Sequence, residues 1–151
     1  MTLDSTLFWQ QKWDLWKQAK QFPPLVQRCD YTLAFVLGRD NFGWEYADDK
    51  NVYSGPKLDL TGATVKLVCE KMPIKPSFPD GARGETWYTT TTVFSVDGTI
   101  TDAEGGEVEF ELDTDDTDAI GRVLAQIQVT DADGKEIVPG HVRIDFTERL
   151  G

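Results

Sequence analysis

The spacing of the apolar residues changes near residue 28, and this change limits what the chain can fold into more than any other feature. Before it, Trp9, Trp13 and Trp16 recur at i, i+4 and i+7, which places the three indoles on one face of a helix. After it, apolar and polar residues alternate along short segments such as EVEFEL at 107–112, a period typical of half-buried strands. The sequence therefore predicts a helical arm followed by a domain of strands and turns.

The helical arm is predicted to span residues 1–28, with its helix running from Asp4 to about Gln21. Pro23 and Pro24 end the helix, because proline donates no backbone hydrogen bond and disfavours helical geometry in the preceding residue. The apolar face can pack either on the chain's own β domain or on another subunit, and the pattern does not decide between them. A membrane surface is disfavoured, since the polar face holds only three lysines and an aspartate. If the helix docks on another subunit, its partner-binding residues are Phe8, Trp9, Trp13 and Trp16.

The β domain is predicted to span residues 29–151 and to form an antiparallel β-sandwich of about six to eight strands. Alternation places one set of side chains in its core: Tyr31, Leu33, Phe35, Leu37, Ala63, Val65, Leu67, Cys69, Val108, Phe110, Leu112, Val142, Ile144 and Phe146. Residues 38–60 are predicted to form a long polar loop that exposes four aromatic side chains, namely Phe42, Trp44, Tyr46 and Tyr53. These four are expected to anchor a protein partner or to pack within the loop, with a carbohydrate platform as the alternative.

The acidic charge of the chain lies in the predicted β domain. The net charge is −11, and residues 1–28 carry four lysines or arginines against two aspartates, so this part is +2 and the remainder is −13. Such a domain would repel a phosphate backbone, and nucleic-acid binding is therefore not expected. No apolar run approaches the roughly 18 residues of a membrane span, and the first residues lack the pattern of a signal peptide. The protein is thus expected to be made in the cytoplasm and to remain soluble.

Few residues suggest catalysis. His141 is the only histidine, and no serine or cysteine lies in a nucleophile motif. We therefore expect no catalytic residues, no metal or other cofactor and no enzymatic activity. The acidic run at 113–118 could hold Ca²⁺, but its spacing does not match an EF-hand loop, and capping of turns is favoured. Cys29 and Cys69 could pair, although two buried free thiols are favoured.

Several consecutive segments of the chain resemble a known family. They are DYTLAFVL at 30–37, LDLTGATVKLVCEK at 58–71, EVEFEL at 107–112, GRVLAQIQVTDADGKE at 121–136 and HVRIDFTERLG at 141–151. In this order they resemble small Ig-like structural proteins of tailed bacteriophage virions. They are similar to the N-terminal domain of phage baseplate upper proteins and to related short tail or fibre-associated proteins. The resemblance covers residues 30–149, about four fifths of the chain.

The resemblance implies an Ig-like sandwich and a structural role without a shared catalytic residue. Such proteins attach fibres or receptor-binding modules to the virion, or sit in the baseplate or on the shell. This sequence differs by ending directly after the Ig-like part and by carrying the tryptophan-rich helix in front, which favours a small tail, baseplate or fibre adaptor or connector. The expected partners are other virion proteins and copies of the chain itself, and the expected location is the virion. The alternatives are a capsid cement or decoration protein, or a carbohydrate- or host-surface-binding module.

Overall fold

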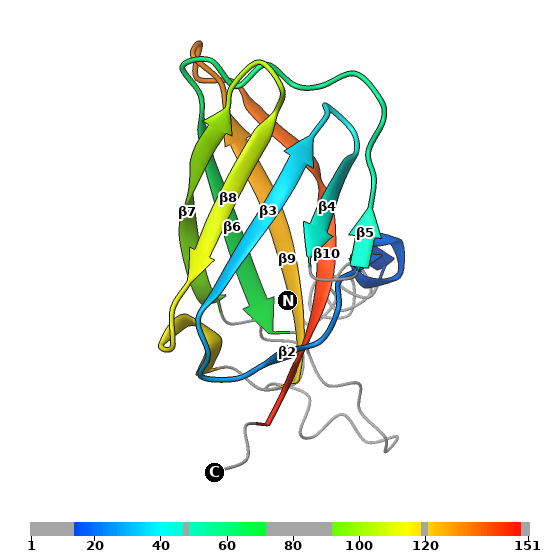
Figure 1. Ribbon diagram of the computed structural model, residues 1–151, viewed down its shortest axis with the longest axis vertical. Coiled ribbons are helices and arrows are strands. Elements are labelled where there is room, and N and C mark those ends of the chain that lie inside the picture. The colour runs from blue at the N-terminus through cyan, green and yellow to red at the C-terminus, as the bar shows by residue number, and fades with distance from the viewer. Residues whose placement is uncertain (1–13, 47–48, 72–91, 119–120, 149–151) are drawn as a thin grey trace, which may run out of the picture.

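The computed structural model describes residues 14–46, 49–71, 92–118 and 121–148, and these form a mainly β chain built around one curled sheet (Figure 1). The prediction of a mainly β protein is confirmed. The strands are β1 (Lys20–Gln21), β2 (Leu25–Val26), β3 (Tyr31–Leu37), β4 (Phe42–Tyr46), β5 (Asp49–Asn51), β6 (Thr64–Lys71), β7 (Thr92–Asp102), β8 (Glu107–Leu112), β9 (Gly121–Thr130) and β10 (Glu136–Thr147). Their order across the sheet is β1-β10-β9-β6-β7-β8-β3-β4-β5, and β2 pairs with β10 beside β1.

Strand β7 joins the two halves of the sheet. Up to Asp97 it pairs with β6, and from Gly98 onward it pairs with β8. We call β1, β2, β10, β9, β6 and the start of β7 half-sheet A, and the end of β7 with β8, β3, β4 and β5 half-sheet B. A Cβ atom at Gly98 would lie 2.7 Å from Cγ2 of Val108 and 2.8 Å from Cε1 of Phe110. Only glycine therefore fits where the strand passes from one half to the other.

One hydrophobic core fills the space between the two half-sheets. It takes alternate residues from each long strand, as the sequence predicts for β3, β6, β8 and β10. Its members from these strands are Leu33, Phe35, Leu37, Val65, Leu67, Cys69, Val108, Phe110, Leu112, Val142, Ile144 and Phe146. Tyr31 and Ala63, also predicted inward, are only partly buried against this core.

The predicted loop at 38–60 is wrong for its first half, because this stretch contains β4 and β5. β4 forms a tight hairpin with β3, and Trp44 of β4 pairs with Asn51 of β5. Apolar and other residues alternate along β4, but over only five residues, and Gly43 interrupts the side-chain pattern. The glycine is required, since a Cβ there would lie 2.1 Å from the backbone oxygen of Asn51. The described residues form ten strands, more than the expected six to eight, because β1, β2, β4 and β5 were not anticipated.

Part of the segment before the predicted boundary at residue 28 joins the sheet, and the boundary itself stays a prediction. Of the described residues of this segment, only 14–18 are helical, and β1 and β2 then pair in parallel with β10. The side chains of Phe22 and Leu25 are fully buried in the core of the β unit. The helix thus ends before Gln21, because the chain gains more by adding strands and two apolar side chains to the sheet than by extending the helix.

A lysine holds the outer edges of the two half-sheets together. Lys20 of β1 donates hydrogen bonds from Nζ to the backbone oxygen of Phe42 and, at 3.2 Å, to Oδ1 of Asn51. Its ammonium also lies 4.8 Å from the centre of the Phe42 ring. Burial lowers the pKa of Lys20 from its ordinary value. On the same side, Gly140 of β10 lies so close to Phe42 that a Cβ would be 2.5 Å from the ring.

Candidate interaction surface

Phe42 and Trp44 are not surface anchors. Their side chains are 2% and 4% exposed and belong to the main core. The indole Nε1 of Trp44 donates a hydrogen bond to Oδ1 of Asp49 at 2.9 Å, and its ring packs 5.1 Å from that of Phe22. The prediction that these two residues contact a partner from an exposed loop is wrong, because β4 turns them inward. A carbohydrate platform that uses Trp44 is excluded for the same reason.

Tyr46 contributes instead to a half-buried aromatic surface. The ladder between β3 and β4 ends at the pair Ala34–Glu45, so the two strands part below that point. Tyr31 and Tyr46 flank the resulting gap, with ring centres 6.3 Å apart in an edge-on arrangement. Val26 of β2 contacts Tyr31 through the hydroxyl of the tyrosine and is 38% exposed. We call Val26, Tyr31 and Tyr46 the aromatic seam.

The seam has ordered polar contacts as well as apolar area. The hydroxyl of Tyr31 accepts a hydrogen bond from the amide of Val26 at 2.8 Å and donates one to its carbonyl at 3.2 Å. The ring of Tyr46 packs 5.2 Å from that of Phe22. Burial is the largest cause that raises the pKa of Tyr46, and the charges of the nearby Tyr31 and Cys29 raise it further. Two of the three seam residues therefore have fixed positions, which suits a preformed contact surface.

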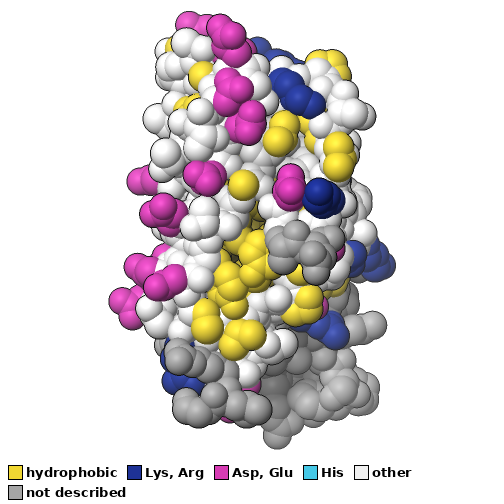
Figure 2. All heavy atoms as spheres, viewed as in Figure 1, with side chains coloured by type: hydrophobic (Ala, Val, Ile, Leu, Met, Phe, Trp, Pro, Cys, Tyr) yellow, Lys and Arg dark blue, Asp and Glu magenta, His cyan; other side chains and the backbone are white. Residues whose placement is uncertain are grey.

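Acidic side chains border this surface. Figure 2 shows hydrophobic side chains gathered in the middle and lower part of the face that Figure 1 presents, with acidic side chains along one side. The outward residues of β8 are Glu107, Glu109 and Glu111. An open groove of about 410 Å³ runs from the seam to this row, and its lining residues are Asp30, Tyr31, Thr32, Glu111, Leu112 and Asp113. An apolar centre with a polar rim is the usual arrangement of a protein contact site.

Tyr53 folds back onto its own loop. Its hydroxyl donates a hydrogen bond to the backbone oxygen of Pro56 at 2.7 Å, and its ring is in contact with Gly38 and Gly55. The ammonium of Lys57 lies 4.9 Å from the centre of the ring. The side chain is half-buried and separate from the seam, so its predicted contact with a partner stays a prediction.

Trp16 packs on the chain's own sheet. Its side chain is 9% exposed and forms a small second cluster with Ala19 and with Leu124 of β9. The guanidinium of Arg143 on β10 lies 5.6 Å from the indole. Of the two alternatives for the helix, packing on its own domain therefore holds for Trp16. The other predicted partner-binding residues of the helix, Phe8, Trp9 and Trp13, lie outside the described residues.

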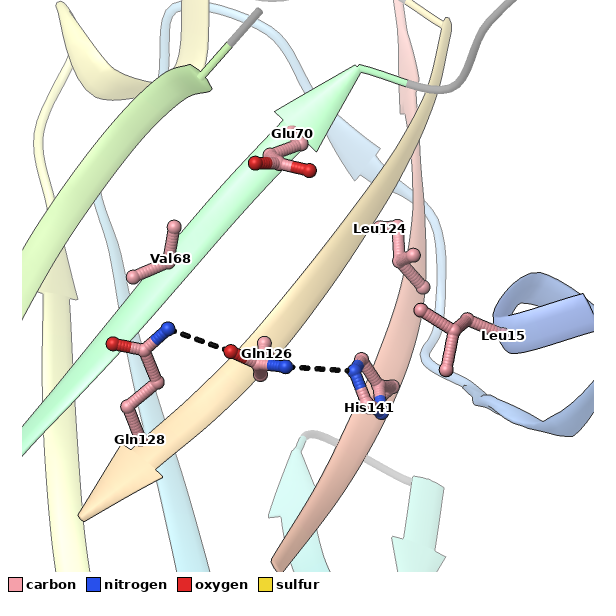
Figure 3. A pocket seen from close by; sticks show the side chains of 7 residues that line it. All are labelled: Leu15, Val68, Glu70, Leu124, Gln126, Gln128 and His141. Carbon is pink, nitrogen blue, oxygen red and sulfur yellow. Dashed lines mark hydrogen bonds between the residues drawn. The ribbon is translucent and has the colours of Figure 1, made fainter. Parts of the chain in front are cut away.

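His141 lies on the outer face of half-sheet A in a shallow pocket of about 100 Å³ (Figure 3). Gln128 donates to Oε1 of Gln126 at 2.6 Å, and Nε2 of Gln126 is 3.0 Å from Nε2 of His141. In this arrangement the imidazole nitrogen accepts, as in a neutral histidine. The remaining lining residues are Leu15, Val68, Glu70 and Leu124. None of the lining side chains is a serine or cysteine nucleophile that His141 could activate.

The acidic run at 113–118 caps its own turn. The amide of Asp116 donates to Oδ1 of Asp113 at 2.8 Å, and the amide of Asp113 donates to Oδ2 of Asp116 at 3.1 Å. Burial is the main cause that raises the pKa of Asp116. Thr117, the last threonine of this run, is fully buried. In the part of the chain that the structure describes, no group of three or more potential metal ligands comes together.

Both cysteines are free thiols. Cys69 on β6 is fully buried in the core, and burial raises the pKa of its thiol. Cys29 is half-buried, and its backbone contacts Thr117. The favoured alternative of two unpaired thiols is therefore what the structure has, although only Cys69 is fully buried.

No protein-family model matches the sequence, and no curated protein is significantly similar to it. Among solved structures, the chain is similar to murine CRIg, with 9% sequence identity over 85% of this chain and 92% of that chain. The TM-score is 0.32, which is too low for the likeness to carry an argument. No helix among the described residues is long and apolar enough to cross a membrane.

Proposed function

We propose that this chain is a non-enzymatic structural subunit of a phage particle, an adaptor or connector of the tail, baseplate or fibre that works through protein–protein contacts. Two features support the proposal. Residues 30–149 resemble Ig-like virion proteins, and the two half-sheets enclose one core in the manner of a sandwich. The finer description is an Ig-like sandwich preceded by a helix, with other virion proteins and copies of the chain as partners.

The aromatic seam is the observation that carries the proposal. Val26, Tyr31 and Tyr46 place apolar area at a gap between strands, and the adjoining groove adds the carboxylates of Asp30 and Glu111. Tyrosine rings are enriched at the centres of protein interfaces, because they bury a large area with few rotatable bonds. The surface fits a partner that offers an apolar ridge with lysine or arginine beside it.

Two exposed valines allow a matched test. Val26 lies in the seam and is 38% exposed, whereas Val52 follows β5, outside the seam, and is 78% exposed. Val26→Arg adds a large charged side chain to the proposed contact, and Val52→Arg makes the same chemical change elsewhere. Phage particles that lack the wild-type gene product are produced in cells that supply one variant. The amount of the chain in purified particles is then measured by mass spectrometry.

We expect Val26→Arg to lower the incorporated amount at least tenfold, because a buried unpaired charge disrupts an apolar contact. Val52→Arg should be incorporated like the wild type. Circular dichroism and urea unfolding of the isolated variants check that both remain folded. Equal incorporation of two folded variants would contradict a contact at the seam, and the absence of the wild-type chain from particles would contradict the virion role itself.

A further inference from the structure

The N-terminal segment lies along the edge of β10 like a strap, in a position that the same segment of a second chain can also occupy. We call residues 14–26 the strap. Its two strands form only two ladder pairs each with β10, and these are the only parallel pairs among the described strands. Phe22, between the two strands, and Leu25, at the start of β2, are fully buried, and the ring of Phe22 lies 5.1 Å from that of Trp44 on β4. The strap thus occupies a slot at the edge of β10 and contributes two buried side chains to the core.

The turn that connects the strap to β3 is strained. Arg28 has φ of 57°, and it is the only described residue other than glycine with a positive φ. This conformation is unfavourable for a residue with a side chain. Thr117 holds the turn in place, since its carbonyl accepts from the amide of Arg28 at 2.9 Å and its hydroxyl accepts from the amide of Cys29 at 3.0 Å. Residues 27–30 therefore form a short hinge that an extended conformation would relax.

We propose that two copies of this chain exchange their straps, so that the strap of each pairs with β10 of the other. The slot already accepts this sequence, so a second copy can remake every contact of the strap without new complementarity. A short strained hinge favours such exchange, because opening relieves the strain in both copies. The inference rests on the proposed function and names a second copy of the chain as one partner.

The position of the aromatic seam agrees with this exchange. Val26 and Tyr31 stand on either side of the hinge and are joined by the two hydrogen bonds of the Tyr31 hydroxyl. An extended hinge of four residues spans at most about 14 Å, so the two copies must approach closely at this point. Exchange would remake the contact between Val26 and Tyr31 across the two copies and hold the two seams close together.

Cross-linking of the strap to β10 tests the exchange directly. Val26 and Thr147 are ladder partners, and both are exposed. The variant Val26→Cys with Thr147→Cys, in a Cys29→Ser background, is concentrated, oxidised and run on a non-reducing gel. An exchanged dimer yields a disulfide-linked band of twice the chain mass, whereas a closed monomer yields a linked band of the chain mass.

Two substitutions at Arg28 in the hinge test whether backbone strain drives the exchange. Arg28→Gly accepts the positive φ without strain, and Arg28→Pro cannot adopt it. We expect the dimer dissociation constant, from light scattering with size-exclusion chromatography, to be at least about tenfold lower for Arg28→Pro than for Arg28→Gly. The exchange would be overturned if disulfides formed only within single chains at every concentration. This must hold for the double-cysteine protein alone and for the same protein combined with a folded Arg28→Pro. If Arg28→Pro does not fold, the double-cysteine protein with the native hinge decides. If the chain is incorporated into particles but does not exchange its strap, only this inference is wrong and the proposed function is unaffected.

Discussion

Thr117 connects two distant parts of the chain through one hydroxyl. Besides accepting from the amide of Cys29, its Oγ1 donates to the carbonyl of Cys29 at 2.7 Å, and the residue is fully buried. The hinge and the acidic turn therefore meet at this side chain. A buried backbone group that loses its partner in such a place has no access to water, and its desolvation is then uncompensated.

Thr117→Val keeps the shape of the side chain and removes the hydroxyl. We expect it to lower the free energy of unfolding by about 1–3 kcal/mol, because the amide and carbonyl of Cys29 lose their partner. Urea unfolding at neutral pH measures the change. Thr101→Val, at an exposed position of β7, is the control and should change stability by less than about 0.5 kcal/mol. Equal effects of the two substitutions would contradict the role given to Thr117.

Tyr46 should make stability depend on pH in the alkaline range. Its pKa is raised in the folded protein, from an ordinary value of 10.0. Above about pH 10 the unfolded chain loses this proton while the folded chain keeps it, so the free energy of unfolding falls as pH rises. The stabilisation is fully present below that pH. Urea unfolding of the wild type and Tyr46→Phe across this range should show a steeper fall for the wild type, and parallel curves would contradict the shift.

At the scale of elements, regular alternation was predictable and short strands were not. β8 reads as three glutamates and three apolar residues in strict alternation, and the structure buries Val108, Phe110 and Leu112 as expected. β1 and β2 hold two residues each, too few for any period, and they form only because the edge of β10 is available. Their assignment depends on contacts with a strand more than a hundred residues away, which no local pattern contains.

The same limit explains what was missed in the candidate surface. β4 was expected to be part of a loop, so Phe42 and Trp44 were expected outside instead of inside. The seam arises where β3 and β4 part, a feature of sheet geometry that a single sequence does not show. The sequence predicts Tyr46 as an exposed aromatic residue of a loop and Tyr31 as a core residue. No pattern in the sequence marks Val26 as a surface contact.

Phe22→Ala tests whether the strap belongs to the β unit. Phe22 is fully buried among Phe35, Trp44 and Tyr46, so its truncation leaves a cavity at the slot. We expect the free energy of unfolding to fall by about 3–5 kcal/mol, in a single cooperative transition. Gln18→Ala, at an exposed position of the strap, is the control and should have little effect. A loss below about 1 kcal/mol for Phe22→Ala would support a separate arm ending at residue 28.

At the scale of the whole molecule, the chain is a curled sheet with an acidic rim and an N-terminal strap that completes its core. The strap covers the outer edge of β10, and Lys20 links that edge to β4 and β5. The half-buried seam is left beside the hinge, where a second copy or another subunit can bury it. A preformed contact surface of this kind supports the proposed role as a connector.

The presence of the chain in purified virions is the most direct test of the structural role. Particles of the phage that, under the proposed function, encodes the chain are purified through a density gradient, washed at high salt and analysed by quantitative mass spectrometry. A structural subunit should remain in the particles in a constant ratio to the major capsid and tail proteins. Recovery of the chain only in the soluble fraction of the lysate, with none in intact particles, would contradict it.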